Sequence, residues 1–252
     1  MLNQQTIDRL AEMKLRSMIS AYQRQREDPS VLDLSFEERF GLIVDSEWIA
    51  RKNRYLQRLL KESKMPIPAC IEDIDYTAKR KLDRKLITRL STGEWVQQHQ
   101  NLLIFGPTGV GKSFLACAMG NLICRLGYAV RYYRVSKLLE ELQAARGDGT
   151  YFKKFNMLKK VPLLILDDWG LKAFSTNDCS LLFELFEERN QKGSTLIAGQ
   201  IPIEYWNKVL LDPTITDAIL DRIIHNAYRL NVDGCTMRMV LSTIPKDEGT
   251  QD

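Results

Sequence analysis

A glycine-rich stretch with one lysine and one serine contains the residue types needed to hold a triphosphate. Residues 106–113 fit the spacing GxxxxGK followed by Ser or Thr and comprise Gly106, Pro107, Thr108, Gly109, Val110, Gly111, Lys112 and Ser113. Glycine lacks a Cβ, so backbone N–H groups can surround the phosphates at close range. Lys112 would neutralise the β- and γ-phosphates, and the Ser113 hydroxyl would ligate Mg²⁺. The stretch therefore predicts an ATP site on a Walker A phosphate loop, and a chance glycine turn is the weak alternative.

Two acidic residues at the end of an apolar run supply a second half of the site. Residues 163–166 are all apolar, and Asp167 and Asp168 follow them. In a parallel sheet, the carboxyl end of such a strand emerges beside the phosphate loop. We expect Asp167 to hold Mg²⁺ and Asp168 to orient or polarise the attacking water, although such a strand end also has purely structural uses.

Two further polar residues are candidates for the catalytic site. Gln200 follows a buried strand predicted at residues 194–198, where it would contact the γ-phosphate or the attacking water, or would only cap a turn. Arg222 lies in a helix predicted at residues 214–226 and is a candidate arginine finger, a guanidinium that reaches the γ-phosphate of a neighbouring subunit. The alternative for Arg222 is a surface side chain paired with Asp217 or Asp221. Arg229 and Arg238 are the next candidates for the finger.

The segments around these residues predict an α/β domain. Residues 102–105 form a buried strand that leads into the loop, and a helix at residues 113–126 points its positive end at the phosphates. A strand at residues 128–134, two helices between residues 135 and 160, the strand before Asp167 and a helix at residues 177–192 follow in alternation. Residues 228–242 predict a terminal hairpin with its turn at Asp233 and Gly234.

The first 65 residues contain one glycine, Gly41, and their apolar spacing predicts three helices. The first carries the apolar residues from Ile7 to Ile19, the second opens at a capping box of Ser35 and Glu38, and the third spans residues 46–63. On the third helix one face holds Trp48, Tyr55, Leu56, Leu59 and Leu60, and the other holds Arg51, Arg54, Arg58 and Lys61. The basic stripe is either a solvated surface or a contact for DNA or an acidic partner.

A segment with two prolines, Met65-Pro66-Ile67-Pro68, interrupts the helical pattern. We therefore divide the chain into a helical module at residues 1–65, a linker at residues 66–76, an ATPase domain at residues 77–245 and a tail at residues 246–252.

Basic residues also gather in two later segments. Residues 77–90 hold six basic residues and one aspartate, and residues 150–161 hold no acidic residue but contain Lys153, Lys154, Lys159 and Lys160. Solvated helix faces explain many such runs, so neither run alone distinguishes a nucleic-acid contact from a solvated surface.

The remaining composition excludes several classes of protein. The five cysteines are scattered and lack CxxC spacing, so neither a disulfide framework nor a zinc site is indicated. No apolar run reaches the roughly 18 residues needed to span a membrane, and the first residues do not resemble a signal peptide. We expect a cytoplasmic protein without a membrane partner.

Four motifs, in this order and spacing, resemble the IstB-type transposition helper ATPases, relatives of the DnaC helicase loaders in the AAA+ superfamily: GPTGVGKS, LLILDDWG, STLIAGQIP and DAILDRIIHNAYRL. The resemblance covers nearly the whole chain. It implies a P-loop AAA+ core, with a central parallel sheet flanked by helices, after a small helical domain and without a C-terminal lid. By motif, Asp167 ligates Mg²⁺, Asp168 is the catalytic acid, Gln200 is sensor 1 and Arg222 is the finger. Most AAA+ proteins have Glu in place of Asp168, and the shorter side chain suggests slow turnover.

The resemblance also implies a function. Such a protein would oligomerise with ATP on duplex DNA and recruit or stimulate the transposase of the same mobile element. The helices between residues 135 and 160 would then bring Lys153 and Lys154 to the DNA phosphates. Two alternatives remain open: a DnaC-like loader that binds a replicative helicase, and a soluble P-loop kinase acting on a small molecule. The kinase would need neither Gln200 and Arg222 nor the basic N-terminal helix.

Overall fold

The computed structural model describes residues 2–77, 82–234 and 237 of the chain. These residues divide into two compact units, one up to Arg58 and one from Leu59 onward. The division falls within a long helix, seven residues before the end of the predicted helical module at residue 65. The roles assigned to the two parts stay predictions.

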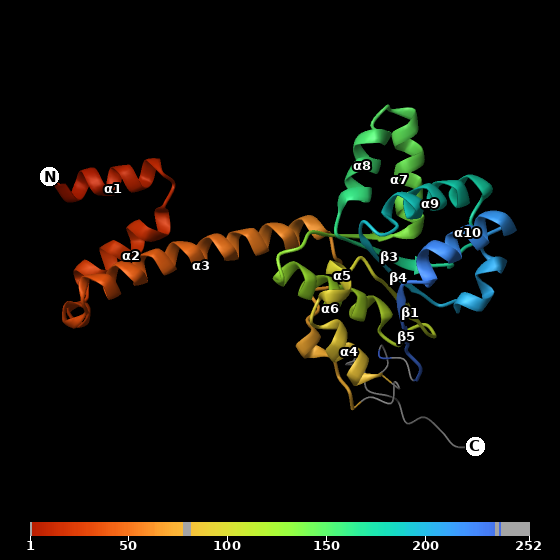
Figure 1. Cartoon of the computed structure of the whole chain (residues 1–252), viewed down its shortest axis with the longest axis horizontal. Coiled ribbons are helices and arrows are strands. Elements are labelled where there is room, and N and C mark those ends of the chain that lie inside the picture. Colours follow the sequence, from red (N-terminus) through yellow and green to blue (C-terminus); the bar gives the residue numbers. More distant parts are fainter. Residues whose placement is uncertain (1, 78–81, 235–236, 238–252) are drawn as a thin grey trace, which may run out of the picture. The chain divides into compact units, whose positions relative to one another are not determined.

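The N-terminal unit contains α1 (Leu2–Glu12), α2 (Arg16–Glu27), the 3₁₀ turn η1 (Pro29–Asp33) and most of α3 (Phe36–Ser63) (Figure 1). The prediction of a single first helix is wrong, because Lys14 adopts a φ of 60° and the Leu15 N–H turns back to the Leu10 carbonyl, which ends α1. The predicted second and third helices are one helix of 28 residues. Its capping box is confirmed, since Ser35 and Glu38 exchange hydrogen bonds of 2.8 and 3.3 Å.

The two faces of α3 are less distinct than predicted. Trp48 is 55% exposed, whereas Leu59 is buried. Arg51 and Arg54 both contact Glu47, at 2.9 and 3.0 Å, and Glu47 is itself buried beneath α2, where it accepts a hydrogen bond from the Ser17 N–H. Helical periodicity does not reveal which side of a helix its neighbour covers, so part of the predicted basic stripe serves to neutralise a buried carboxylate.

The second unit is built on a parallel sheet of five strands in the order β2-β3-β4-β1-β5. The strands are β1 (Asn101–Phe105), β2 (Val130–Arg134), β3 (Leu163–Trp169), β4 (Ser194–Gly199) and β5 (Ala227–Asn231). The predicted terminal hairpin is wrong at its first strand, because β5 pairs in parallel with β1. Most of the second strand of that hairpin, including Arg238, lies outside the described residues.

Helices alternate with these strands, as the sequence predicts. They are α4 (Arg84–Leu90), α5 (Glu94–Gln97), α6 (Lys112–Arg125), α7 (Val135–Gly147), α8 (Tyr151–Lys160), α9 (Thr176–Arg189) and α10 (Pro213–Ile224), with 3₁₀ turns η2 (Ile71–Asp73) and η3 (Ile203–Lys208). The basic helix predicted at residues 77–90 begins later, at Arg84, because the Asp83 carboxylate caps the Leu86 N–H at 3.0 Å. Residues 78–81 of that segment lie outside the described residues.

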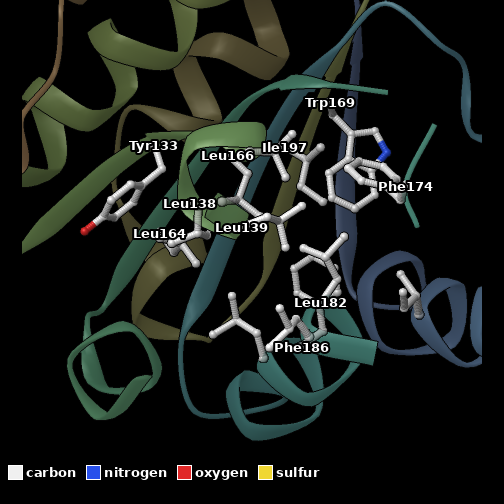
Figure 2. Packing of buried hydrophobic residues seen from close by; sticks show 14 of the residues in the cluster. Tyr133, Leu138, Leu139, Leu164, Leu166, Trp169, Phe174, Leu182, Phe186 and Ile197 are labelled. Atoms are coloured by element: carbon white, nitrogen blue, oxygen red, sulfur yellow. The ribbon is translucent and has the colours of Figure 1, made fainter. Parts of the chain in front are cut away.

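Both faces of the sheet are covered, so its strands are apolar on both sides. On one face, Leu164 and Leu166 of β3 pack with Leu138 of α7 and Phe186 of α9 (Figure 2). On the other face, α6 approaches β3 so closely that a Cβ on Gly120 would lie 2.8 Å from the Ile165 side chain. The sheet therefore holds the start of α6, directly after the glycine-rich loop, in a fixed place beside the strand ends.

A buried arginine ties α8 to the sheet. Arg189 donates to the carbonyls of Leu158 and Val161 at 2.6 and 2.8 Å, to the Thr195 hydroxyl at 3.1 Å and to the Ser194 carbonyl. Burial lowers the pKa of this guanidinium. The end of α8 and the start of β4 are thus joined through one side chain.

Candidate nucleotide-binding site

The glycine-rich loop connects β1 to α6 and takes a path that side chains would block. Gly106, Gly109 and Gly111 have φ of 156°, 85° and 95°. A Cβ on Gly106 would lie 1.9 Å from the Val232 carbonyl oxygen, so only glycine lets the loop pass the residue that follows β5. Gly111 directly precedes α6, whose first N–H groups lack partners within the helix and suit an anion.

Contacts within the loop hold its lysine near the phosphate position. The Lys112 ammonium donates to the carbonyls of Gly106 and Pro107, at 2.8 and 2.7 Å. Val110 is fully buried and anchors the loop to the core. The Gly109 carbonyl accepts a hydrogen bond of 2.8 Å from the Met237 N–H. The loop is therefore braced both by the core and by the segment after β5.

One cavity of about 540 Å³ collects most of the predicted site residues, and this volume is in the range of a small-molecule site. Its lining includes Thr108, Gly109, Gly111, Lys112, Ser113, Asp167, Asp168 and Gln200. Gly106 and Pro107 instead line an adjoining hollow of about 420 Å³, together with Gln200 and Arg229. Phe114 and three residues of the predicted linker, Ile67, Asp73 and Asp75, also line the main cavity. Sequence reasoning missed these four, because a linker carries no motif that marks a binding site and Phe114 follows the last residue of the Walker A motif.

Asp167 is fixed by two hydrogen bonds. It is buried and accepts from the Tyr132 hydroxyl at 2.7 Å and from the Asp168 N–H at 2.8 Å. Burial, and to a lesser extent the hydrogen bond to Asp167, raises the pKa of Tyr132, so this phenol remains a neutral donor. Sequence reasoning also missed Tyr132, since its role depends on β2 lying next to β3.

Asp168 has different surroundings. The register between β3 and β4 is irregular from Leu166 to Trp169, and Asp168 adopts a φ of 59°. Such an irregularity re-aims a side chain that would otherwise alternate with its neighbours. The Asp168 carboxylate lies 3.3 Å from the Arg134 guanidinium at the end of β2, and because both are partly exposed, this pair is weak. Asp168 therefore faces the cavity while Asp167 is held by the sheet.

The donor set fits Mg²⁺ better than a metal that requires a cage of protein ligands. No group of three or more His, Cys, Asp or Glu side chains that could hold a metal occurs among the described residues. Mg²⁺ is commonly held by one or two protein oxygens, with phosphates and waters completing its shell. The Ser113 hydroxyl and the Asp167 carboxylate, which line the same cavity, supply such oxygens.

Arg222 does not line this cavity within its own chain. Its guanidinium bonds to Glu187 of α9, lies 3.5 Å from Asp221 and stacks over the Phe183 ring, 5.3 Å from the centroid. The hydrogen bond that Arg222 donates to Glu187 raises the pKa of the guanidinium. The pairing with Asp221 was one of the predicted alternatives, whereas Glu187 was not foreseen, because α9 and α10 are far apart in sequence.

The lysines of α8 differ in their surroundings. Lys154 pairs with Glu141 of α7 at 2.8 Å and Lys159 with Glu188 at 3.2 Å. Lys153 is exposed. On α3, Arg58 lies over the Tyr55 ring and Lys61 is exposed.

In the part of the chain that the structure describes, no helix is both long and apolar enough to cross a bilayer.

Comparison with known proteins gives consistent matches. Residues 8–243 match the protein family described as IstB-like ATP binding protein. The chain is 42% identical over 238 residues to the insertion sequence ATP-binding protein y4pL of Sinorhizobium fredii, covering 94% of this chain and 97% of that protein. It is also 42% identical over 203 residues to the ATP-binding protein of insertion sequence IS1162 from Pseudomonas fluorescens, covering 80% of this chain and 88% of that protein.

Solved structures show the same fold at lower identity. The crystal structure of DnaI has a TM-score of 0.55 at 22% identity, covering 72% of this chain and 93% of that chain. AMPPCP-bound DnaA from Aquifex aeolicus has a TM-score of 0.56 at 19% identity, covering 70% of this chain and 54% of that chain. The predicted AAA+ core with a central parallel sheet flanked by helices is confirmed.

Proposed function

Because this chain belongs to the family of IstB-like ATP-binding proteins, we propose that it binds and hydrolyses ATP and assists the transposition of an insertion sequence. With ATP it assembles into an oligomer on duplex DNA and recruits or stimulates the transposase of the same element. The observation that carries the proposal is the convergence of Lys112, Ser113, Asp167, Asp168 and Gln200 on one cavity.

In the proposed mechanism, each residue works from the position described above. The Lys112 ammonium gives up its hydrogen bonds to the carbonyls of Gly106 and Pro107 and binds the β- and γ-phosphates instead. The N–H groups at the start of α6 bind the same phosphates. Ser113 and Asp167 would hold Mg²⁺, which would neutralise negative charge on the phosphates. Asp168 orients the attacking water, and Gln200 contacts the γ-phosphate.

Arg222 acts on the ATP of a neighbouring subunit in this proposal. Its place on α10, away from the cavity of its own chain, supports a role in trans. Transition-state charge on the γ-phosphate is then stabilised only after assembly, which links hydrolysis to oligomer formation.

DNA is held through phosphate contacts. On the α/β unit Lys153, Lys154 and Lys61 supply them, and on the N-terminal unit Arg51, Arg54 and Arg58 do so. Lys154, Arg51 and Arg54 already have carboxylate partners, so they contribute less per residue than an unpaired cation does. Tight binding therefore depends on many subunits linked together.

The experiment is ATP hydrolysis by the purified protein, with and without duplex DNA, combined with electron microscopy of the assembled particles. We expect slow basal turnover, stimulation by DNA, and particles on DNA that require ATP. Lys112→Ala should lose binding and hydrolysis together. The loader alternative would be supported instead if DNA left the rate of ATP hydrolysis unchanged and pull-downs captured a replicative helicase rather than a transposase.

A further inference from the structure

One aromatic side chain on α8, Phe152, lies largely outside the core, with its ring edge-on to Tyr151 at 5.9 Å between centroids. Phe152 is 78% exposed, the largest exposed fraction among the large apolar side chains that the structure describes. The residues that anchor α8 to the rest of the unit are Tyr151, Phe155 and Leu158, all of them buried. Burial of apolar surface therefore does not explain a phenylalanine at position 152.

The surroundings of Phe152 are cationic. At 100° per residue, Phe152, Lys153, Asn156 and Lys160 fall within about 100° of one another on the exposed side of α8. Among the described residues, no carboxylate pairs with Lys153 or Lys160, whereas Lys159 at the edge of this face is paired with Glu188. This surface, which we call the α8 face, combines one planar ring with two available positive charges.

The chemistry of the α8 face favours a nucleic acid over a protein. Phe152 is the only large apolar side chain exposed between residues 135 and 160, all of which the structure describes. A protein interface needs a contiguous apolar patch at its centre, and one ring surrounded by lysines does not provide it. A polynucleotide offers phosphates to the lysines and flat apolar bases to a single ring.

The α8 face is also presented rigidly. Arg189 bonds to the carbonyls at the end of α8, and Lys154 bridges to α7. The Tyr151 hydroxyl, next to Phe152 in the chain, donates to Glu184 of α9 at 2.9 Å. In Figure 1, α7 and α8 lie side by side and project beyond the sheet. Little backbone ordering is therefore needed when Phe152 meets a ligand.

We propose that Phe152 inserts between adjacent bases of bound duplex DNA, while Lys153 and Lys160 contact the flanking phosphates. The proposal rests on the DNA binding proposed above and adds an intercalating residue to it. Insertion unstacks one base step, so sites with a flexible pyrimidine–purine step at that position bind best.

The test uses duplexes that carry 2-aminopurine, whose fluorescence rises when the base is unstacked. Wild-type protein with ATP should raise the signal at discrete positions. Phe152→Ala should abolish the rise and weaken DNA binding about tenfold, with the salt dependence of affinity unchanged. Lys153→Ala, the adjacent control, should keep the rise but reduce the salt slope by roughly one phosphate contact. In Phe152→Trp, DNA binding should quench the fluorescence of the new indole.

Because Phe152 is exposed, its variants should retain the wild-type melting temperature, which is measured first. If wild-type protein binds DNA and Phe152→Ala matches it in affinity and 2-aminopurine signal, the inference is wrong and the proposed function stands. If Phe152→Ala loses transposase capture but not DNA affinity, the α8 face binds protein and the inference is also wrong. A wild type that does not bind DNA overturns both.

Discussion

Two adjacent carboxylates at the end of β3, those of Asp167 and Asp168, have different surroundings because the backbone of the strand is irregular there. Asp167 is buried with two hydrogen-bond donors, and Asp168 is 36% exposed at its side chain with a φ of 59°. A buried, fully bonded carboxylate suits a fixed metal ligand, whereas an exposed one can meet water. The proposed division of labour thus follows from the surroundings of two chemically identical side chains.

Replacing Asp168 by Asn should separate ATP binding from hydrolysis. Asn tolerates a positive φ well, so the backbone should keep its path while the charge that orients water is lost. We expect hydrolysis to fall by about a hundredfold or more while ATP affinity stays near that of the wild type. Steady-state hydrolysis and binding of a fluorescent ATP analogue measure the two quantities. Asp45→Asn, an exposed change on α3, serves as the control. Loss of ATP binding would identify Asp168 as an essential metal ligand instead.

Removing the Tyr132 hydroxyl should weaken Mg²⁺ binding specifically. Tyr132→Phe leaves the buried Asp167 with one donor fewer, and loss of such an outer hydrogen bond commonly lowers metal affinity by about tenfold or more. The readout is a Mg²⁺ titration of nucleotide binding, with the affinity for metal-free ATP unchanged. Tyr133→Phe is the matched control, because Tyr133 packs in the apolar cluster on the opposite face of the sheet. Equal titrations in the two variants would refute the positioning role of Tyr132.

At the scale of helices and strands, features that depend on a short stretch of sequence were predicted from that stretch. The phosphate loop follows a strand and opens a helix, as the glycine spacing and the apolar run at residues 102–105 require. Residues 135–160 form two helices, as predicted, and the break between α7 and α8 falls at residues 148–150. Gln200 and the two aspartates reach one cavity because all the strands are parallel, so their carboxyl ends share an edge.

Other features depend on contacts between distant segments and were not predictable. The order of the strands, with β4 between β1 and β3, decides that Tyr132 meets Asp167, and no periodicity reveals that order. The linker lines the cavity because η2 packs against α6, and Gly120 of α6 leaves room for Met65, the residue directly before the linker. The division of the first predicted helix needed only the left-handed backbone at Lys14, a conformation that lysine seldom adopts.

Two buried thiols on α6 should make the free energy of unfolding fall as the pH rises above 9. Burial raises the pKa of Cys117 and of Cys124 from 9.0 to about 11 in each case. Below pH 9 the thiols are protonated in both states and contribute no pH dependence. Between pH 9 and 11 the unfolded thiols ionise first, so the native state binds more protons and the free energy of unfolding falls as pH rises.

The expected loss is about 1 kcal/mol per thiol by pH 10. Urea unfolding between pH 8 and pH 10.5 measures it, with the double variant Cys117→Ala, Cys124→Ala as the reference. The variant should be less stable overall, because it leaves cavities, but should show a shallower decline with pH. Parallel declines in the two proteins would exclude the thiols as the cause.

At the scale of the whole molecule, Arg222 connects one subunit to the next in the proposed assembly. In its own chain Glu187 and Asp221 hold its guanidinium. A neighbouring phosphate must therefore replace two partly exposed carboxylates, Glu187 and Asp221, as the partner of Arg222, at a modest cost in free energy. This competition would make hydrolysis cooperative with oligomer formation.

Mixing two inactive variants tests the role in trans. Arg222→Ala subunits retain the phosphate loop, and Lys112→Ala subunits retain the finger, so a mixture should recover part of the hydrolysis that each lacks alone. Arg125→Ala, which removes another exposed and paired arginine, is the control and should hydrolyse ATP normally. A mixture that co-assembles but stays inactive would exclude Arg222, and Arg229, which lines the hollow beside Gly106, would be examined next.

The close approach of Gly106 to Val232 also constrains how the protein is made. The loop follows β1, yet the partners of β1 are β4 and β5, which the ribosome releases much later, and Val232 comes after both. A nascent chain that has completed its Walker A sequence therefore lacks the wall against which the loop is shaped. ATP cannot guide the early folding of this chain, because the loop takes its nucleotide-binding shape only after Val232 has been synthesised.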